Sequence, residues 1–403
     1  MRGNVIVNAD TPGSSIPVLS QTYSYHKISV IIPAYNAAST IARALDSIKA
    51  QSLKEIEIII VNDGSTDLTE LEIMTYIKNN PEMDITYLYQ ENAGPGAARN
   101  MGIDHATGDY ITFMDADDQI PVGAYHSMYY TAQQWDCDVV IGSYMRRVNR
   151  EKWYEPEYIK DLCTKMEGKN CAGNYQIVIH NPSLWNRAYR RNFLNENEIR
   201  FLSEWHGEDV VFNLDTVKKA ERIYTVDAIT YFYGQQIAEQ SSLSTAWTYK
   251  NTSSRIRTTK QYVLFFDRIG DIDSETAYLK VGLPYLLEGL KKVADKAERD
   301  KLFEEAKEIL AQYLGNKRYE PLIELILGAK LETVLAVPFD SYMVQKKMLY
   351  NLLNRSGNAN YPALQENGNY KDIVLSQFSE GKVGFRYILR YMGAWLKYKL
   401  RHF

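Results

Sequence analysis

Short runs that are apolar on both faces alternate with helical stretches in the first part of the chain, and this alternation constrains the fold most. The runs begin at Ile28, Ile56, Ile85, Tyr110 and Val139. Strands of this kind are typical of parallel sheets that are covered by helices on both sides. The alternation therefore predicts a doubly wound α/β sheet over about residues 27–145, with ligands bound beyond the carboxyl ends of its strands.

The rest of the chain has a different pattern. Residues 1–26 show no sustained period and are expected to form an N-terminal arm. The α/β domain is expected to extend to residue 245, because the irregular, polar stretch after residue 146 is typical of long loops that complete a site. Helical periodicity dominates residues 246–403 and predicts an α-helical C-terminal region.

Composition and charge exclude several classes of protein. The chain has 403 residues, of which 45% are hydrophobic and 24% charged, as in folded globular proteins. Lys and Arg total 46 against 50 Asp and Glu, so the chain lacks the basic excess that nucleic-acid binding needs. Three cysteines without a Cys-x-x-Cys pair indicate neither a disulfide framework nor a zinc site. With no segment like a signal peptide or membrane span, we expect a cytoplasmic protein that does not bind nucleic acid.

Carboxylates follow two of the predicted strands directly. Asp63 comes after the second run, and Asp115, Asp117 and Asp118 come immediately after the fourth. So much negative charge in one place is costly unless a cation shares it, and hard oxygen ligands suit Mg²⁺ or Mn²⁺. The alternative interpretation is a helix-capping turn at Asp63 and a solvated acidic turn at the other three residues.

Two further segments carry candidate functional residues. The segment that starts at Gly94 is close to a dinucleotide-binding motif, but Arg99 replaces the third glycine and the segment follows the third strand. We therefore favour a close approach at a helix start, with Arg99 directed at an acid or a phosphate. Glu208 and Asp209 stand at the start of a predicted helix, where simple capping is the alternative interpretation.

Taken in order, these segments resemble the family 2 glycosyltransferases of the GT-A fold. The segments are Pro33-Ala34-Tyr35-Asn36, Val61 to Asp67, Gly94 to Asn100, Asp115 to Asp118, Trp185 to Tyr189 and Gly207-Glu208-Asp209. The resemblance implies an α/β nucleotide-diphospho-sugar transferase domain, with a nucleotide half at 27–118 and an acceptor half at 119–245. It also implies an inverting transferase that uses a nucleotide-sugar donor, usually a UDP-sugar, with Mg²⁺ or Mn²⁺.

The resemblance also implies a role for individual residues. Asp117 would bind the metal, Asp209 would be the general base, and Glu208 would support the acceptor pocket. The donor-binding residues that it implies are Pro33, Tyr35, Asn36, Asp63, Gly94, Arg99, Asp115, Ala116 and Trp185. Among these, Pro33, Tyr35 and Asp63 would hold the nucleobase, and Trp185 would form a wall of the sugar site.

The sequence departs from the family pattern at one point. Many relatives carry Arg or His soon after a tyrosine-rich strand, on a loop that closes over the diphosphate. Here Tyr231-Phe232-Tyr233 leads into Gly234 and two glutamines. Arg187, Arg190 and Arg191 are the candidates to supply that positive charge instead.

The expected function is transfer of a sugar to a hydroxyl of a glycan or lipid-linked acceptor in the synthesis of surface polysaccharides or glycoconjugates. A sugar-phosphate nucleotidyltransferase is one alternative, but the sequence lacks the glycine-rich basic loop that such an enzyme carries near its start. A non-catalytic glycan- or partner-binding relative is the other. It would be expected to have lost its acids, and Asp63, Asp115, Asp117 and Asp209 are all present.

Residues 382–403 carry basic residues and no acid, and their spacing predicts a basic amphipathic helix. Such a helix can lie on an anionic membrane surface, which would make the protein peripheral on the inner face of the membrane. The equal alternative is docking on the helical region or on a second subunit of a homo-oligomer.

Overall fold

The chain divides into two compact units, Met1–Ala246 and Trp247–Phe403, each with a hydrophobic core of its own. The computed structural model describes residues 6–8, 25–147, 152–202, 207–234, 247–313, 315–316, 320–327, 331–340 and 342–343. The predicted amphipathic helix at 382–403 lies outside the described residues. Membrane binding and docking on protein therefore both stay predictions.

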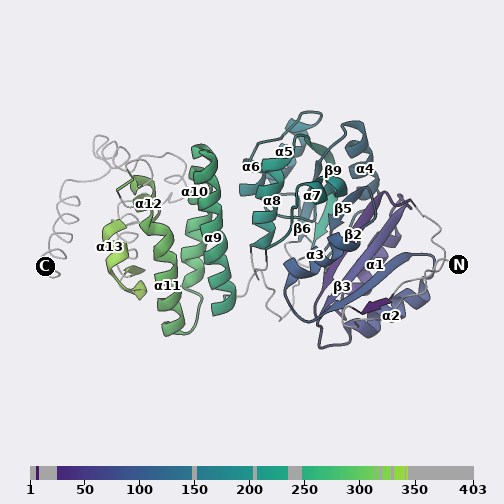
Figure 1. Cartoon of the computed structure of the whole chain (residues 1–403), viewed down its shortest axis with the longest axis horizontal. Coiled ribbons are helices and arrows are strands. Elements are labelled where there is room, and N and C mark those ends of the chain that lie inside the picture. Colours follow the sequence, from purple (N-terminus) through teal and green to yellow (C-terminus); the bar gives the residue numbers. More distant parts are fainter. Residues whose placement is uncertain are drawn as a thin grey trace, which may run out of the picture. The chain divides into compact units, whose positions relative to one another are not determined.

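The first unit is built on one mixed sheet (Figure 1). Its strands are β1 (Ile6–Asn8), β2 (Ile28–Ala34), β3 (Ile56–Asp63), β4 (Asp84–Gln90), β5 (Tyr110–Phe113), β6 (Val139–Arg147), β7 (Trp153–Tyr154), β8 (Arg187–Arg190) and β9 (Ile223–Tyr233). The order is β1-β4-β3-β2-β5-β8-β6-β7, and β9 also pairs with β6. The first five strands in this order are parallel, whereas β8 runs antiparallel to both β5 and β6.

Helices cover both faces of this sheet, as the apolar runs predict. They are α1 (Ile41–Lys49), α2 (Thr69–Asn79), α3 (Pro95–His105), α4 (Ala124–Gln134), α5 (Glu157–Met166), α6 (Gln176–Ile179), α7 (Arg191–Glu196) and α8 (Glu208–Lys219). Val30 and Ile32 of β2 pack in a core with residues of α1, α2 and α4. Ile31 points to the opposite face, where it meets Gly102 of α3 so closely that an added Cβ would lie 2.3 Å from Ile31 Cγ2. The predicted α/β fold is confirmed.

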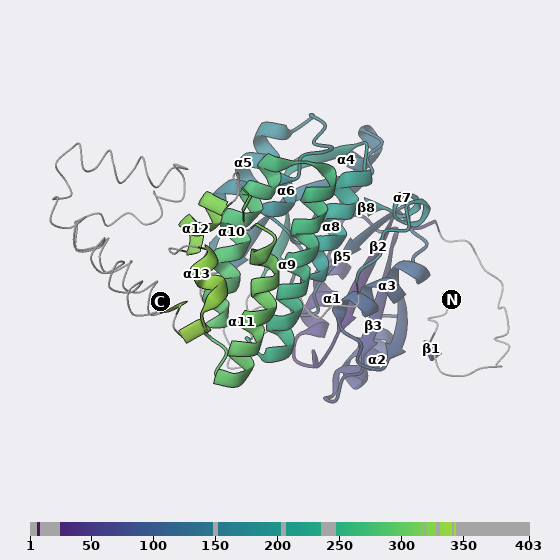
Figure 2. The same ribbon diagram turned by 60° about the vertical axis from the view of Figure 1, so that its left-hand side comes forward.

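The region between residues 146 and 245 has more regular structure than its sequence pattern indicates. It contains β9, which is labelled in Figure 1, and β8 together with α5 to α8, which are labelled in Figure 2. The pairing of β9 with β6 shifts register around Ser143. Such a shift breaks the alternation of buried and exposed residues from which strands are recognised in a sequence. In the predicted N-terminal arm, β1 adds a strand that pairs with β4.

The described part of the second unit, which ends at residue 343, is helical, as the predicted C-terminal region requires. Its described helices are α9 (Tyr249–Ile269), α10 (Ile272–Leu290), α11 (Lys296–Ala311), α12 (Glu320–Leu327) and α13 (Leu331–Ala336). The side chains of Thr248, Asp271 and Asp295 each accept a hydrogen bond from a backbone N–H three residues later. These N-caps satisfy donors that the first turn of a helix leaves open, and they fix where α9, α10 and α11 begin.

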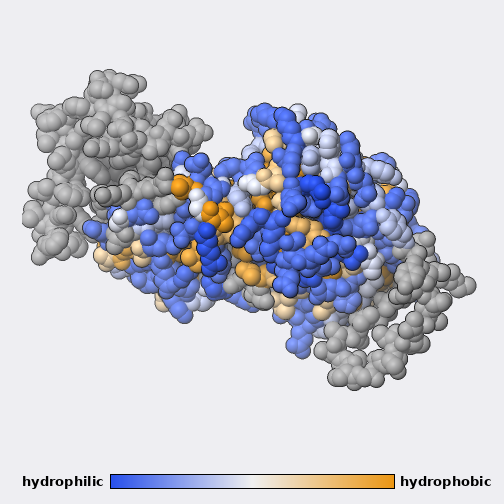
Figure 3. Space-filling view, turned by 45° about the horizontal axis from the view of Figure 1, so that its top comes forward, coloured by the Kyte–Doolittle hydropathy of each residue, from blue (hydrophilic) through white to orange (hydrophobic). Residues whose placement is uncertain are grey.

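Figure 3 shows a face on which hydrophilic side chains cover most of the described surface, with smaller apolar patches among them. Within the described part of the chain, none of the helices has the length and apolar character that crossing a membrane requires.

Candidate active site

The loops that follow β2 and β3 lie at the same edge of the sheet and are hydrogen-bonded to each other. Asn36 donates its backbone N–H to Ser65 Oγ at 3.0 Å and accepts from Thr66 N at 2.8 Å through its Oδ1 atom. Asn36 has a φ of 50°, a left-handed conformation that asparagine tolerates well. Pro33 is partly buried at the end of β2, and Tyr35 is 49% exposed. These residues form one rim at the carboxyl ends of the strands.

Asp63 is the last residue of β3, and its buried carboxylate organises the start of α3. Its Oδ1 atom accepts hydrogen bonds from Gln90 Nε2 at 2.7 Å and from Ala93 N at 2.9 Å. Its Oδ2 atom accepts from Gly94 N at 3.0 Å. Gly94 has a φ of 94°, which favours glycine. The structure thus brings Asp63 and Gly94 together, and their binding to a donor stays a prediction.

Helix α3 lies close to Phe201, Leu202 and the first residue of α8. A Cβ atom added to Gly96 would lie 2.7 Å from Leu202 O and 3.3 Å from Glu208 Cγ. The side-chain amide of Asn100 donates to Phe201 O at 2.9 Å and accepts from Phe201 N at 2.8 Å. It therefore binds both backbone polar groups of Phe201. The sequence predicted the close approach, but it gave no signal for the partner of Asn100.

This close approach predicts that Gly96→Ala is destabilising although alanine is the better helix former. The new methyl group meets the backbone carbonyl oxygen of Leu202, which cannot move away as the end of a flexible side chain could. We expect the free energy of unfolding to fall by about 1–2 kcal/mol in denaturant titrations. Ala97→Gly, on the neighbouring half-buried position, calibrates the helix-propensity contribution alone. A Gly96→Ala protein as stable as wild type would argue against the close approach.

Arg99 joins the acid-rich loop after β5 to the start of α8. Its Nη1 atom lies 2.7 Å from Glu208 Oε1, and its Nη2 atom lies 3.1 Å from Asp115 Oδ1. Arg99 and Glu208 are both buried, and the guanidinium lies 5.5 Å from the centre of the Phe201 ring. An acid is one of the two partners that the sequence predicted for Arg99. The bridge brings together residues that are 109 positions apart in the chain.

Asp209 lies beside this bridge, in the first turn of α8. Gly207, with a φ of 83°, precedes the helix, and Asp209 Oδ1 accepts a hydrogen bond from Val210 N at 2.8 Å. Burial and the neighbouring charge of Glu208 raise the pKa of Asp209 to about 7, against the opposing effect of Arg99. A carboxylate with a pKa near neutrality is well suited to accept a proton from a substrate.

The three acids after β5 have different surroundings. Asp118 is buried and accepts hydrogen bonds from Tyr231 OH and Gly234 N, both at 2.8 Å. Burial, together with the charges of Asp117 and Asp115, raises the pKa of Asp118 well above its ordinary value. Asp115 and Asp117 are partly exposed at the end of the strand. They are therefore the acids of this loop that a ligand can reach.

These two carboxylates fit the coordination chemistry of Mg²⁺ or Mn²⁺. Such ions are commonly held by one or two protein carboxylates and complete their shell with water and substrate phosphates. Within the described ranges, no group of three or more His, Cys, Asp or Glu side chains is arranged to enclose a metal. The two carboxylates therefore suit a metal ion that is also bound by a diphosphate better than an ion that is enclosed by protein alone.

Trp185 belongs to an aromatic cluster next to the acids. Its ring stacks on Tyr231 at 4.3 Å and on Tyr233 at 5.3 Å, and it meets the ring of Tyr144 edge-on at 4.7 Å. Ala116 is buried between the acids and packs in the same core. The structure thus brings Trp185 to the acid-rich loop, while its contact with a sugar stays a prediction.

Residues 29–197 match the family model for Glycosyl transferase family 2. This region belongs to that family. Over 241 residues, 56% of the chain, it is 33% identical to the glycosyltransferase GlyA of Streptococcus pneumoniae, and over 217 residues, 52% of the chain, it is 32% identical to the uncharacterized glycosyltransferase YibD of Escherichia coli. The matches cover 32% and 62% of these two relatives, less than two thirds of either length.

The chain is also similar in fold to a protein of known structure. The crystal structure of S. aureus TarS 1–349 superimposes with a TM-score of 0.59 at 18% identity, and the match covers 84% of this chain and 91% of that one. At so low an identity the likeness shows the fold alone. It confirms the GT-A fold that the ordered motifs predicted.

The prediction that Arg187 supplies positive charge to the diphosphate is wrong. Arg187 is fully buried, and its guanidinium donates to Asn213 Oδ1 and to the carbonyl oxygen of Ile177, both at 3.0 Å. It also donates to the carbonyl oxygen of Asn181. Arg187 therefore ties β8 to its neighbours and presents no face to a ligand.

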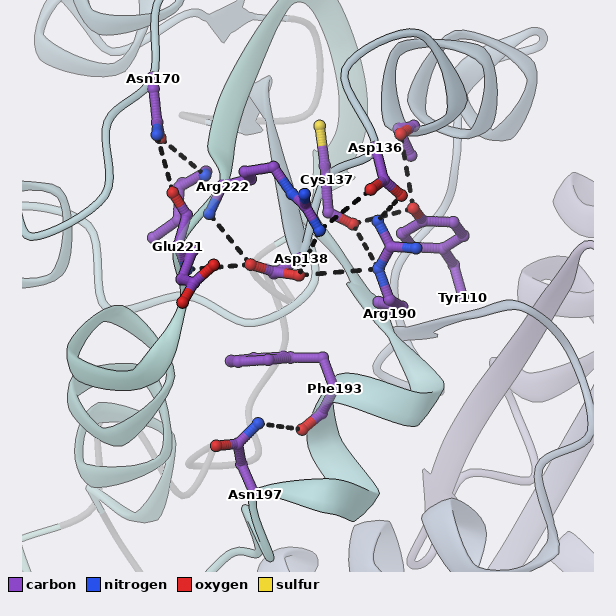
Figure 4. A network of polar contacts seen from close by, with 12 residues as sticks. Tyr110, Asp136, Cys137, Asp138, Asn170, Arg190, Phe193, Asn197, Glu221 and Arg222 are labelled. Carbon is purple, nitrogen blue, oxygen red and sulfur yellow. Dashed lines mark hydrogen bonds and ion pairs between the residues drawn. The ribbon is translucent and has the colours of Figure 1, made fainter.

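The same prediction for Arg190 and Arg191 is wrong for a different reason. Arg190 pairs with Asp136 at 2.5 Å and donates to Cys137 O at 3.0 Å, within the network shown in Figure 4. Arg191 donates to Gly108 O at 2.8 Å. These partners precede β6 and β5, so both arginines lie at the amino ends of these strands. The acids of the candidate site follow the carboxyl end of β5.

Proposed function

We propose that this chain transfers a sugar from a nucleotide-sugar donor, first of all a UDP-sugar, to a hydroxyl of a glycan or lipid-linked acceptor. The transfer is metal-dependent, inverts the anomeric centre and serves the synthesis of surface polysaccharides or glycoconjugates. The observation that carries the proposal is the bridge from Asp115 through Arg99 to Glu208. Because of it, the acids after β5 and the candidate base Asp209 belong to one site.

On the donor side, Pro33, Tyr35 and Asp63 hold the nucleobase, and Asp115 lies near the ribose or the donor sugar. Asn36 supports this rim by accepting a hydrogen bond from Thr66 N, and Gly94 supports it by donating one to the Asp63 carboxylate. A Mg²⁺ or Mn²⁺ ion at Asp117 would supply positive charge against the leaving diphosphate.

On the acceptor side, Asp209 takes the proton from the attacking hydroxyl. Burial beside Glu208 favours proton uptake by Asp209, and Arg99 limits this effect, so with a pKa of about 7 a large share of the carboxylate is ionised near neutral pH. The hydroxyl approaches the anomeric carbon from the face opposite the diphosphate, so a single displacement inverts that centre. Trp185 offers an aromatic face to the sugar, and Glu208 supports the acceptor pocket.

The raised pKa of Asp209 predicts how the rate of transfer depends on pH. A general base works only when deprotonated, and the pKa is about 7. We therefore expect kcat/KM to fall about tenfold for each pH unit below the pKa and to level off above it. Initial rates from about pH 5 to about pH 9 test this expectation. A rate that does not change over that range would argue against Asp209 as the base.

A screen of nucleotide-sugars tests the proposed function itself. A ligand that binds the folded protein raises its melting temperature, so the full chain is heated with each nucleotide-sugar, with and without Mn²⁺. We expect one donor class to stabilise the protein, and to do so more strongly with the metal. The anomeric configuration of the product of that donor then tests inversion. If no nucleotide-sugar stabilises the protein under either condition, the proposal is refuted.

A further inference from the structure

The acid-rich loop is hydrogen-bonded to the end of β9 through one tyrosine. We call residues 115–118 the acid loop. The hydroxyl of Tyr231 accepts a hydrogen bond from Asp115 N at 3.1 Å and donates one to Asp118 Oδ2 at 2.8 Å. The other carboxylate oxygen of Asp118 accepts from Gly234 N at 2.8 Å. One hydroxyl thus holds the first and the last residue of the loop.

The surroundings keep this hydroxyl in place. Tyr231 is 1% exposed and Asp118 is 2% exposed, and the ring of Trp185 stacks on the ring of Tyr231. Directly after the loop, Gln119 pairs with Phe232: Phe232 N donates to Gln119 O at 2.9 Å, and Gln119 N donates to Phe232 O at 3.4 Å. The acid loop therefore has a rigid support in β9, more than 110 residues away in the chain.

We propose that Tyr231 and Asp118 are positioning residues, which hold Asp115 and Asp117 in the geometry that a metal-bound diphosphate needs, and that Asp118 is not itself a metal ligand. Both carboxylate oxygens of Asp118 already accept a hydrogen bond, one from Tyr231 of β9 and one from Gly234, the residue after β9. A four-residue loop fixed at both ends leaves Asp117 few conformations, so less entropy is lost when a ligand orders it. This inference rests on the proposed function.

The test measures binding of UDP to the full chain in the presence of Mn²⁺ by calorimetry, together with the melting temperature. Tyr231→Phe and Asp118→Ala each remove hydrogen bonds to the loop, and we expect each to weaken binding about tenfold or more. Asp118→Asn keeps the shape of the side chain. Its amide can donate to Tyr231 and its carbonyl oxygen can accept from Gly234, so we expect a loss within about threefold.

Tyr110→Phe is the matched control. Tyr110 is a buried tyrosine whose hydroxyl donates to Cys137 O at 2.9 Å, near the amino end of β6. Tyr110→Phe removes a buried tyrosine hydroxyl and its hydrogen bonds, as Tyr231→Phe does, but we expect its affinity for UDP to equal that of wild type. Comparison at similar melting temperatures separates positioning from general loss of stability.

Two results would overturn the inference. The first is wild-type affinity in Tyr231→Phe. The second is an equal loss in Asp118→Asn and Asp118→Ala, because a metal ligand, unlike a positioning residue, loses its function with its charge. In both cases wild type still binds UDP, so the proposed function stands. If wild type binds neither UDP nor another nucleoside diphosphate with Mn²⁺, the proposed function and this inference both fail.

Discussion

Asp209→Asn is expected to abolish most sugar transfer while donor binding stays nearly as in wild type. The amide has almost the shape of the carboxyl group but cannot accept a proton at any pH of interest. Removal of a general base typically costs about 10²- to 10⁴-fold in rate. The measurement is kcat with the donor found in the screen, alongside the dissociation constant of that donor.

Two other substitutions make this result specific. Asp215 lies further along the same helix α8, and the Asp215→Asn protein is expected to transfer at the wild-type rate. In the Asp117→Asn protein, by contrast, we expect metal-dependent binding of the donor to be weakened. Full transfer activity in purified Asp209→Asn protein would refute its assignment as the base.

The central strands could be predicted from the sequence because of how they are buried. Val30, Ile31 and Ile32 follow one another in β2 and are all fully buried. Consecutive strand residues point to opposite faces, so such a run is stable only where helices cover both sides. Burial on both faces stabilises the strand and also produces the continuous apolar run that is visible in the sequence. For that reason the predicted run from Ile28 to Ile32 lies wholly within the observed strand, Ile28–Ala34.

The arginines show where prediction from the sequence stops. Arg99 and Arg187 are the same residue type, and both are buried. Arg99 meets two acids of the candidate site, whereas Arg187 is bound to an asparagine and to backbone carbonyl oxygens. Only the path of the chain through β8 and α8 decides which of them reaches the site. The segment that starts at Gly94 marks Arg99 as a candidate in the sequence, whereas no local pattern around Arg187 indicates its buried partners.

The contact between Tyr231 and Asp118 is a second case. The two residues are 113 positions apart, and β9 itself was not predicted because its pairing with β6 shifts register. A tyrosine-rich segment was visible in the sequence, but its partner was not. The acid loop could be recognised from its composition, whereas the support that holds it depends on the tertiary fold.

Arg99→Met is expected to cause the largest loss of stability among the variants described for the site. It removes the cation that Asp115 and Glu208 share and leaves the buried carboxylate of Glu208 without its partner. Breaking a buried ion pair in this way costs about 3–5 kcal/mol in the free energy of unfolding. The charge of Arg99 also lowers the pKa of Asp209, so its removal should move the pH profile of transfer to higher pH.

Chemical denaturation of three further variants tests the cause of that loss. Arg200→Met removes an exposed pair, 3.0 Å from Asp104, and is expected to cost less than about 1 kcal/mol. In the double variant Arg99→Met with Glu208→Gln, the buried charge that lost its partner is gone, so part of the stability should return. Glu208→Gln alone closes the double-mutant cycle. If the two losses simply add, Arg99 stabilises the site by packing and not by its charge.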